Sequence, residues 1–240
     1  MAQGTLSAAN VVQATTGTAD STNTASVALD AGTQAGSTVI VELWAAGASM
    51  MDGGMTGRVP AGFEYDACGS TSANRVLQTF RKPNVAAGEG VAGSTAWDFA
   101  PGFPTNWGWR VTEWDTGLDP VFPLETTVGN FATGTSPTNL DSGTTTENGR
   151  AITVCLGWHL WQRSSVTAQS MTWSNHTGGF TERASLRQTY TAVEMGSSWS
   201  WRFNTTVGQY ATTADINLAS RDGGDVYVAQ VVVYAATTYG

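Results

Sequence analysis

Hydrophobic and polar residues alternate in short runs along most of this chain, which is the pattern of β-strands with one buried face. The clearest run is 107–114, Trp-Gly-Trp-Arg-Val-Thr-Glu-Trp. Side chains of a strand alternate between its two faces, so Trp107, Trp109 and Val111 share one face. We expect that face to be buried in a core.

Glu113 falls on the same face as these apolar residues. A buried carboxylate requires hydrogen bonds. We expect them to come from neighbouring backbone amides, or from Arg110 or Arg150 through a bend. Glu113 and Arg110 are therefore the candidate structural polar residues.

Turn-forming residues divide the chain into two series of candidate strands. The first series is 24–29, 38–45, 64–68, 75–81, 95–99 and 107–114; the second is 146–160 with a break, 170–173, 180–185, 188–195, 199–203, 215–218 and 226–235. No long stripe with the period of a helix is present. The pattern predicts an all-β protein of antiparallel, jelly-roll-like sandwich type with very little helix.

The two series repeat one another in order, at spacings of 112 to 120 residues. The matched segments are 16–18 with 133–135, 38–44 with 151–158, 61–65 with 178–182, 75–80 with 187–192, and 110–114 with 230–234. We predict two tandem copies of one β-sandwich unit, 1–119 and 120–240, as separate domains or fused into one larger sandwich. The alternative is that any two all-β segments look alike. Segment 115–132 is predicted to be the linker between the copies.

Comparison of the copies assigns faces to the strands. We expect Val39, Val41 and Leu43 to face the core, and they align with Ile152, Val154 and Leu156. Glu42 and Cys155 are then expected on the opposite face of their strands. Glu113 aligns with Val233. We therefore expect Glu113 to hold the linker or a contact between the copies in place.

Charge excludes several classes of partner. The net charge is -8 and Lys82 is the only lysine, so binding to nucleic acid or to an anionic membrane surface is not expected. No apolar run is long enough for membrane insertion, and the start lacks the features of a signal peptide, which predicts synthesis in the cytoplasm. Cys68 and Cys155 are expected to be free, buried thiols, with a disulfide as the alternative.

The candidate chemistry is sparse. Glu42 and Glu113 lie beside tryptophans and are the only carboxylates that suggest a glycosidase. His159 and His176 are the only histidines, and no nucleophile elbow is present. The acidic residues at turn 222–225 and at Asp52 are of the type that binds calcium, but ordinary turn formation explains them without an ion. We expect no catalytic residues, no metal and no cofactor.

Tryptophan is the strongest functional signal, with ten in 240 residues. Trp158 and Trp161 cannot both face one core if their strand continues, so one of them is a candidate exposed platform for a sugar or a neighbouring subunit. With His159 between them, they form the candidate ligand-binding set. The pairs 107/109 and 199/201 are expected to fill the space between sheets.

Several motifs resemble tail-associated β-sandwich proteins of bacteriophages that infect actinobacteria. They are the Thr-Val-Ile-Val strand, the Pro-Ala-Gly-Phe turn, the strand ending in Arg81-Lys82, the 87–90 turn, the closing 109–114 strand and the 228–234 strand. The resemblance covers most of 14–236 and implies a minor tail or surface protein of the virion. It transfers no catalytic residue.

On this interpretation the partners are other virion proteins, further copies of the chain, for which we expect a trimer, and a host cell-wall glycan. The rival hypotheses are a free carbohydrate-binding module or lectin and, third, a β-sandwich glycosidase.

Overall fold

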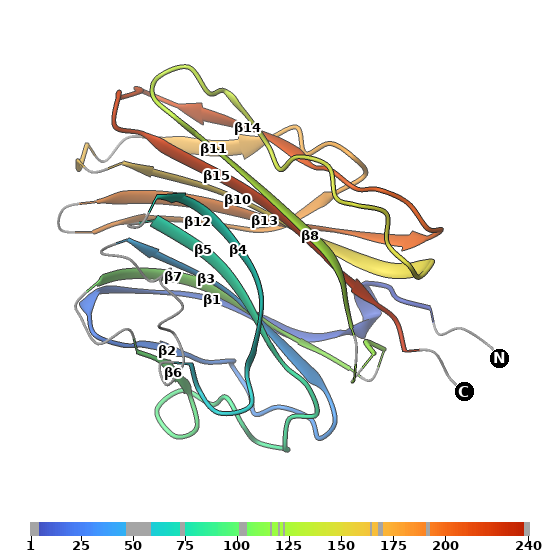
Figure 1. Ribbon diagram of the computed structural model, residues 1–240. Coiled ribbons are helices and arrows are strands. Elements are labelled where there is room, and N and C mark those ends of the chain that lie inside the picture. The colour runs from blue at the N-terminus through green and yellow to red at the C-terminus, as the bar shows by residue number, and fades with distance from the viewer. Residues whose placement is uncertain are drawn as a thin grey trace. The chain divides into compact units, whose positions relative to one another are not determined.

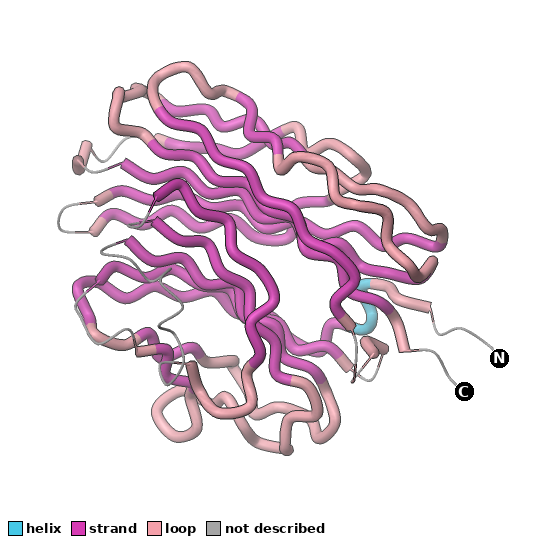
Figure 2. Tube along the Cα trace, viewed as in Figure 1, coloured by secondary structure: helices cyan, strands magenta, loops and turns pink. Residues whose placement is uncertain are grey.

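The computed structural model describes residues 5–46, 59–72, 75–100, 105–115, 117–119, 121, 123–163, 165–167, 170–190 and 193–237. β-Strands make up nearly all of the regular structure in this part of the chain (Figure 2). Its one helical element is the 3-10 turn Ala8–Asn10. The prediction of an all-β fold with very little helix is confirmed.

The chain divides into two compact units. The first contains residues 1–68, 72–124 and 234–240, and the second contains 69–71 and 125–233. The units thus meet in sequence between Leu124 and Glu125, and the last residues of the chain belong to the first unit. The boundary between residues 119 and 120 stays a prediction.

The first unit is built on a five-stranded sheet with the order β1-β7-β3-β5-β4, and β2 pairs with β6 as a second, small sheet (Figure 1). The strands are β1 (Val11–Thr22), β2 (Ala25–Val27), β3 (Thr38–Ala46), β4 (Glu64–Ser72), β5 (Arg75–Lys82), β6 (Trp97–Phe99) and β7 (Thr105–Trp114). One core cluster joins the two sheets. It contains Val39, Val41 and Leu43 of β3, Trp107, Trp109 and Val111 of β7, and Val27, Trp97 and Phe99 of the small sheet. The faces predicted for β3 and β7 are confirmed.

The second unit has a five-stranded sheet with the order β12-β13-β10-β15-β8 and a three-stranded sheet with the order β11-β14-β9. Its strands are β8 (Leu124–Thr133), β9 (Asn139–Asp141), β10 (Ile152–Arg163), β11 (Met171–Ser174), β12 (Thr181–Thr189), β13 (Glu194–Thr205), β14 (Thr213–Leu218) and β15 (Val226–Ala235). Trp161, Trp173, Ile216 and Tyr227 pack together between these two sheets.

Both units have the same strand order. If β11 is set aside as an addition, the strands β8, β9, β10, β12, β13, β14 and β15 take the places of β1 to β7 in sequence. The order β1-β7-β3-β5-β4 then corresponds to β8-β15-β10-β13-β12, and the pair β2-β6 to β9-β14. The turns before β4 and β12 also agree, because Phe63 N donates to Pro60 O and Phe180 N to Thr177 O, each at 3.2 Å.

Two predictions about the strands are wrong. Segment 115–132, expected to be a linker, contains most of β8. Segment 187–192 was matched by sequence to β5, but residues 187–189 form the end of β12, and the strand in the place of β5 is β13. The edge strands β1 and β8 were missed because each buries few side chains, which leaves a weak hydrophobic alternation.

The predicted face of Cys155 is also wrong. Cys155 packs against Phe180, Val231 and Val233 in a core cluster, so Val154 faces the opposite side of β10. A shift of one residue in the alignment reverses every side chain of a strand. The prediction of a free, buried thiol is confirmed for Cys155, and burial raises its pKa to about 12. The side chain of Cys68 lies outside the described residues.

Glu113 is fully buried and accepts three hydrogen bonds within the first unit. The donors are Gln13 Nε2, Gln34 N and Ser37 Oγ, each at 2.6 Å from a carboxylate oxygen. A backbone amide is among the donors, as predicted, but Arg110 and Arg150 are not. Glu113 therefore fixes the loop that leads into β3. None of these three donors lies in segment 115–132, and the role of Glu113 between the copies stays a prediction.

We predict that Glu113→Val, which introduces the residue of the sister strand, lowers the free energy of unfolding by about 3 kcal/mol. The physical reason is that Gln34 N and Ser37 Oγ lose their shared acceptor in a buried place. Urea unfolding followed by tryptophan fluorescence measures the change. Glu147→Val, at an exposed glutamate, serves as the control and should cost less than about 0.5 kcal/mol. Equal effects of the two substitutions would contradict the role of Glu113.

Candidate functional site

A groove in the second unit is the best candidate for a binding site. It has a volume of about 240 Å³ and is lined by Met171, Thr172, Trp173, Glu182, Ser185, Leu186 and Arg187. These residues come from β11 and β12, which are the edge strands of the two sheets of this unit. The groove is therefore the open side of the second sandwich.

Met171 sets the depth of this groove. A Cβ atom at Gly196 would lie 1.9 Å from the sulfur of Met171, so β13 can accept the methionine only because residue 196 has no side chain. Ser198, two positions further on and therefore on the same face of β13, is also small and fully buried. Two small residues on this face of β13 thus make room for the β11 side chains.

One wall of the groove is polar. His176 Nε2 and Ser198 Oγ are 2.8 Å apart, and Ser198 Oγ donates to Glu182 Oε1 at 3.3 Å. Arg187 lies further along β12 with its guanidinium 3.7 Å from Glu194, and 36% of its side chain is exposed. The groove therefore offers one carboxylate and one guanidinium, and both keep hydrogen-bonding capacity for a ligand.

A second depression adjoins the groove. It has a volume of about 230 Å³, is lined by residues of β11 and β14, and shares Met171 and Thr172 with the groove. Each volume is below the roughly 300–1,000 Å³ of pockets that enclose a whole small molecule. The two depressions together suit an extended ligand that lies along β11, with one part of the ligand in each depression.

The predicted ligand-binding residues lie beneath the surface. Trp158 and Trp161 are 1% and 0% exposed, and the Trp158 ring stacks on Trp199 with centroids 5.4 Å apart. The two tryptophans do lie on opposite faces of β10, as expected for positions three apart. Neither forms an exposed platform, because residues on both faces of this central strand are buried.

His159 is fully buried but lies next to the groove. Its ring is 6.2 Å from Trp173, which lines the groove, and 5.6 Å from His176. Burial lowers the pKa of His159 to about 3, with a smaller contribution from His176. His159 therefore supports the groove from behind as a neutral ring and does not face a ligand.

The contact between Ser198 and His176 differs from a hydrolase triad. In such a triad the acid orients the histidine. Here Glu182 contacts the serine instead, and Ser198 is fully buried. The arrangement explains how Glu182 is held at the groove, and it does not present a nucleophile to a substrate.

Glu42 and Glu113 cannot act as a glycosidase pair. Glu113 is the register partner of core-facing Val39, whereas Glu42 lies on the other face of the same sheet opposite Arg110. Burial raises the pKa of Glu42 to about 7, and Arg110 opposes this rise. Arg110 is itself buried, and it lies on the opposite face of the sheet from Glu113.

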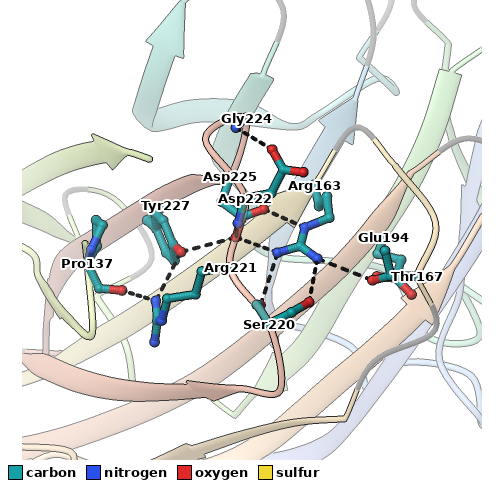
Figure 3. A network of polar contacts seen from close by, with 10 residues as sticks. All are labelled: Pro137, Arg163, Thr167, Glu194, Ser220, Arg221, Asp222, Gly224, Asp225 and Tyr227. Carbon is teal, nitrogen blue, oxygen red and sulfur yellow. Dashed lines mark hydrogen bonds and ion pairs between the residues drawn. The ribbon is translucent and has the colours of Figure 1, made fainter. Parts of the chain in front are cut away.

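The turn considered for calcium is held by an internal ion pair (Figure 3). Arg163 Nε and Nη2 donate to the two carboxylate oxygens of Asp225 at 2.6 and 2.8 Å, and both side chains are buried. Asp222 caps the turn by accepting from Gly224 N at 2.9 Å. The Asp225 carboxylate is thus occupied by a guanidinium. Residue 52 lies outside the described residues.

The groove residues were missed because they form no motif. Glu182 and Arg187 stand five positions apart on a strand that reads as ordinary. By simple alternation, positions five apart lie on opposite faces of a strand, and the bulge between Glu182 and Ala184 brings these two charges to one face. No sequence signal was therefore available for this pair.

We predict that His159 makes the second unit less stable in mild acid. In the unfolded chain this histidine is protonated below pH 6.5, whereas in the folded chain it stays neutral. The unfolded state therefore binds more protons, and the free energy of unfolding decreases as the pH is lowered. The loss reaches up to about 1.4 kcal/mol per pH unit below pH 6.5.

Urea unfolding at pH 7.5 and 5.5 should show a smaller difference for His159→Phe than for the unsubstituted protein. Glu42 and Asp66, whose pKa values are raised to about 7 and about 6 by burial, work in the opposite direction, since they lose stability as pH rises. Both proteins contain them, so their effect cancels in the comparison. An equal pH dependence of the two proteins would contradict the prediction.

Within the described residues, no helix has the length and hydropathy required to cross a membrane. Comparisons with protein family models, with curated protein sequences and with solved structures gave no match.

Proposed function

We propose that this chain is a structural protein of a bacteriophage particle, a minor tail or surface component that has no catalytic role. The observation that carries the proposal is that the motifs of the resemblance belong to one framework. The Pro-Ala-Gly-Phe motif forms the turn before β4, with Gly62 at φ 85°, and the closing 109–114 segment lies in β7, between β1 and β3.

The shared strand order of the two units supports an internal duplication of this framework. A duplicated sandwich suits a particle protein, because such a protein contributes shape and stable surfaces and needs no reactive centre. The buried ion pair of Arg163 with Asp225 and the buried hydrogen bonds of Glu113 are consistent with this role, since they fix the positions of loops.

We predict that the protein is present in purified particles of the phage that encodes it. Particles banded in a density gradient should contain the chain by mass spectrometry after a high-salt wash, and antibodies against it should label the tail or the particle surface. A protein that stays in the soluble lysate and never sediments with particles would overturn the proposal. A major capsid protein followed in the same gradient is the control for intact particles.

The second candidate function is carbohydrate binding, in a free module or on the particle. The groove favours it, because Glu182 and Arg187 provide charged hydrogen-bonding groups beside Trp173, and because a second depression continues along β11. Sugar recognition combines such planar or charged hydrogen bonds with contact to an aromatic side chain. Bacterial cell-wall polysaccharide is the ligand of first choice.

We predict that Glu182→Gln and Arg187→Ala each weaken binding of a cell-wall oligosaccharide about 10- to 100-fold, since each removes a charged hydrogen bond worth roughly 1.5–3 kcal/mol. Isothermal titration calorimetry measures the change, after a glycan array has selected the oligosaccharide. Arg183→Ala is the matched control, because Arg183 lies on the same strand with its guanidinium over the ring of Trp201. An array without binding, or equal losses in all three variants, would exclude this groove as a sugar site.

A further inference from the structure

We infer that this chain pairs with a second copy of itself through the free edge of β1, antiparallel and about a two-fold axis. β1 is the last strand of its sheet and is hydrogen-bonded on one side only, to β7. Among the described residues, no backbone hydrogen bond joins 11–19 to a segment on the other side. A row of unpaired N–H and C=O groups is a template for another strand.

This edge lacks the usual protection against pairing. Natural proteins protect edge strands with charges, prolines, bulges or short length. β1 is 12 residues long, and Asp20 near its end is its only charged residue. Its register with β7 is irregular only between Val11 and Gln13 and between Ala19 and Thr22. The stretch from Gln13 to Ala19 is thus a regular, uncharged ladder.

The other long edges are less suited to self-pairing. β12 carries Glu182, Arg183 and Arg187 and has a bulge between Glu182 and Ala184. Antiparallel pairing of β12 with itself about Ser185 would set Arg183 opposite Arg187, and like charges directly opposite are destabilising.

The remaining two edges differ from β1 as well. β4 carries two carboxylates, Glu64 and Asp66, that are held by Arg81 of the neighbouring strand. β8 is shorter, with 10 residues against the 12 of β1, and carries Glu125 as its second residue. Within the described residues, β1 is the longest edge strand, and its regular stretch from Gln13 to Ala19 carries no charge.

The β1 sequence is compatible with pairing to itself. A two-fold axis at Thr16 would set Thr15 opposite Gly17 and Ala14 opposite Thr18, and no two charges would face each other. Threonine is favoured in strands and forms good cross-strand pairs. Such a contact is closed and uses the same surface of both copies, which is the commonest symmetry of protein oligomers. The inference is independent of the proposed function, because it rests on the edge strand alone.

The test compares two edge variants with the unsubstituted protein. Gel filtration with light scattering should give about 50 kDa for the unsubstituted protein, twice the 25.1 kDa of the chain. Ala14 and Thr16 are exposed on β1, and the double variant Ala14→Lys with Thr16→Lys should dissociate at least about tenfold more readily. Thr127→Lys, at an exposed position of β8, is the matched control and should remain a dimer.

Hydrogen exchange gives a second readout that does not depend on how the variants fold. In the unsubstituted protein, amides between Gln13 and Ala19 should exchange more slowly as the protein concentration rises. A monomer at roughly 100 µM overturns the inference, since contacts weaker than this are not specific assemblies. A mass of three chains overturns it too, and so does dissociation by Thr127→Lys with the β1 variant intact.

Discussion

Both units depend on placing large side chains directly against backbone that has no Cβ atom. A Cβ at Gly17 would lie 2.4 Å from the ring of Trp109, as one at Gly196 would lie 1.9 Å from the sulfur of Met171. Contacts this short do not occur, so any other residue would have to displace the large side chain. In the first unit this constraint lets Trp109 of β7 pack into the core beside β1, and in the second it shapes the groove. Glycine and large side chains therefore occur together in this chain because the glycines leave the space that the large side chains fill.

The second constraint is that charge inside a β-sandwich must be satisfied locally. Glu113 receives hydrogen bonds from neutral donors, whereas Asp225 is paired with Arg163. Both carboxylates tie a loop to a central strand, the first before β3 and the second before β15. Glu42 follows a third course, because burial raises its pKa to about 7 and so favours its neutral form. Two of the buried carboxylates, Glu113 and Asp225, therefore act on loop position.

The strand faces that follow from strong hydrophobic alternation were predicted from the sequence. The features that depend on which strands pair with each other were missed. The faces of β3 and β7 followed from the apolar residues that recur at every second position, 39, 41 and 43 in β3 and 107, 109 and 111 in β7. β1 and β8 lie at sheet edges and bury few side chains on either face, so they show little alternation. The predicted face of Cys155 was wrong because the alignment of the two copies was shifted by one residue, and the local pattern of β10 does not reveal such a shift. The groove could not be predicted, since it arises where the edges of two sheets from the same unit approach each other.

The difference between Glu113 and Val233 has a consequence for how the chain reaches its native state. Two units with one strand order create a hazard during folding, because a strand of one unit could enter the corresponding place in the other, as happens in domain swapping. β15 in the place of β7 would leave the hydroxyl of Ser37 without its acceptor. β7 in the place of β15 would bury a carboxylate beside Phe180 and Val231. This pair of positions thus helps to distinguish the two closing strands, because each exchange raises the energy of the misfolded chain.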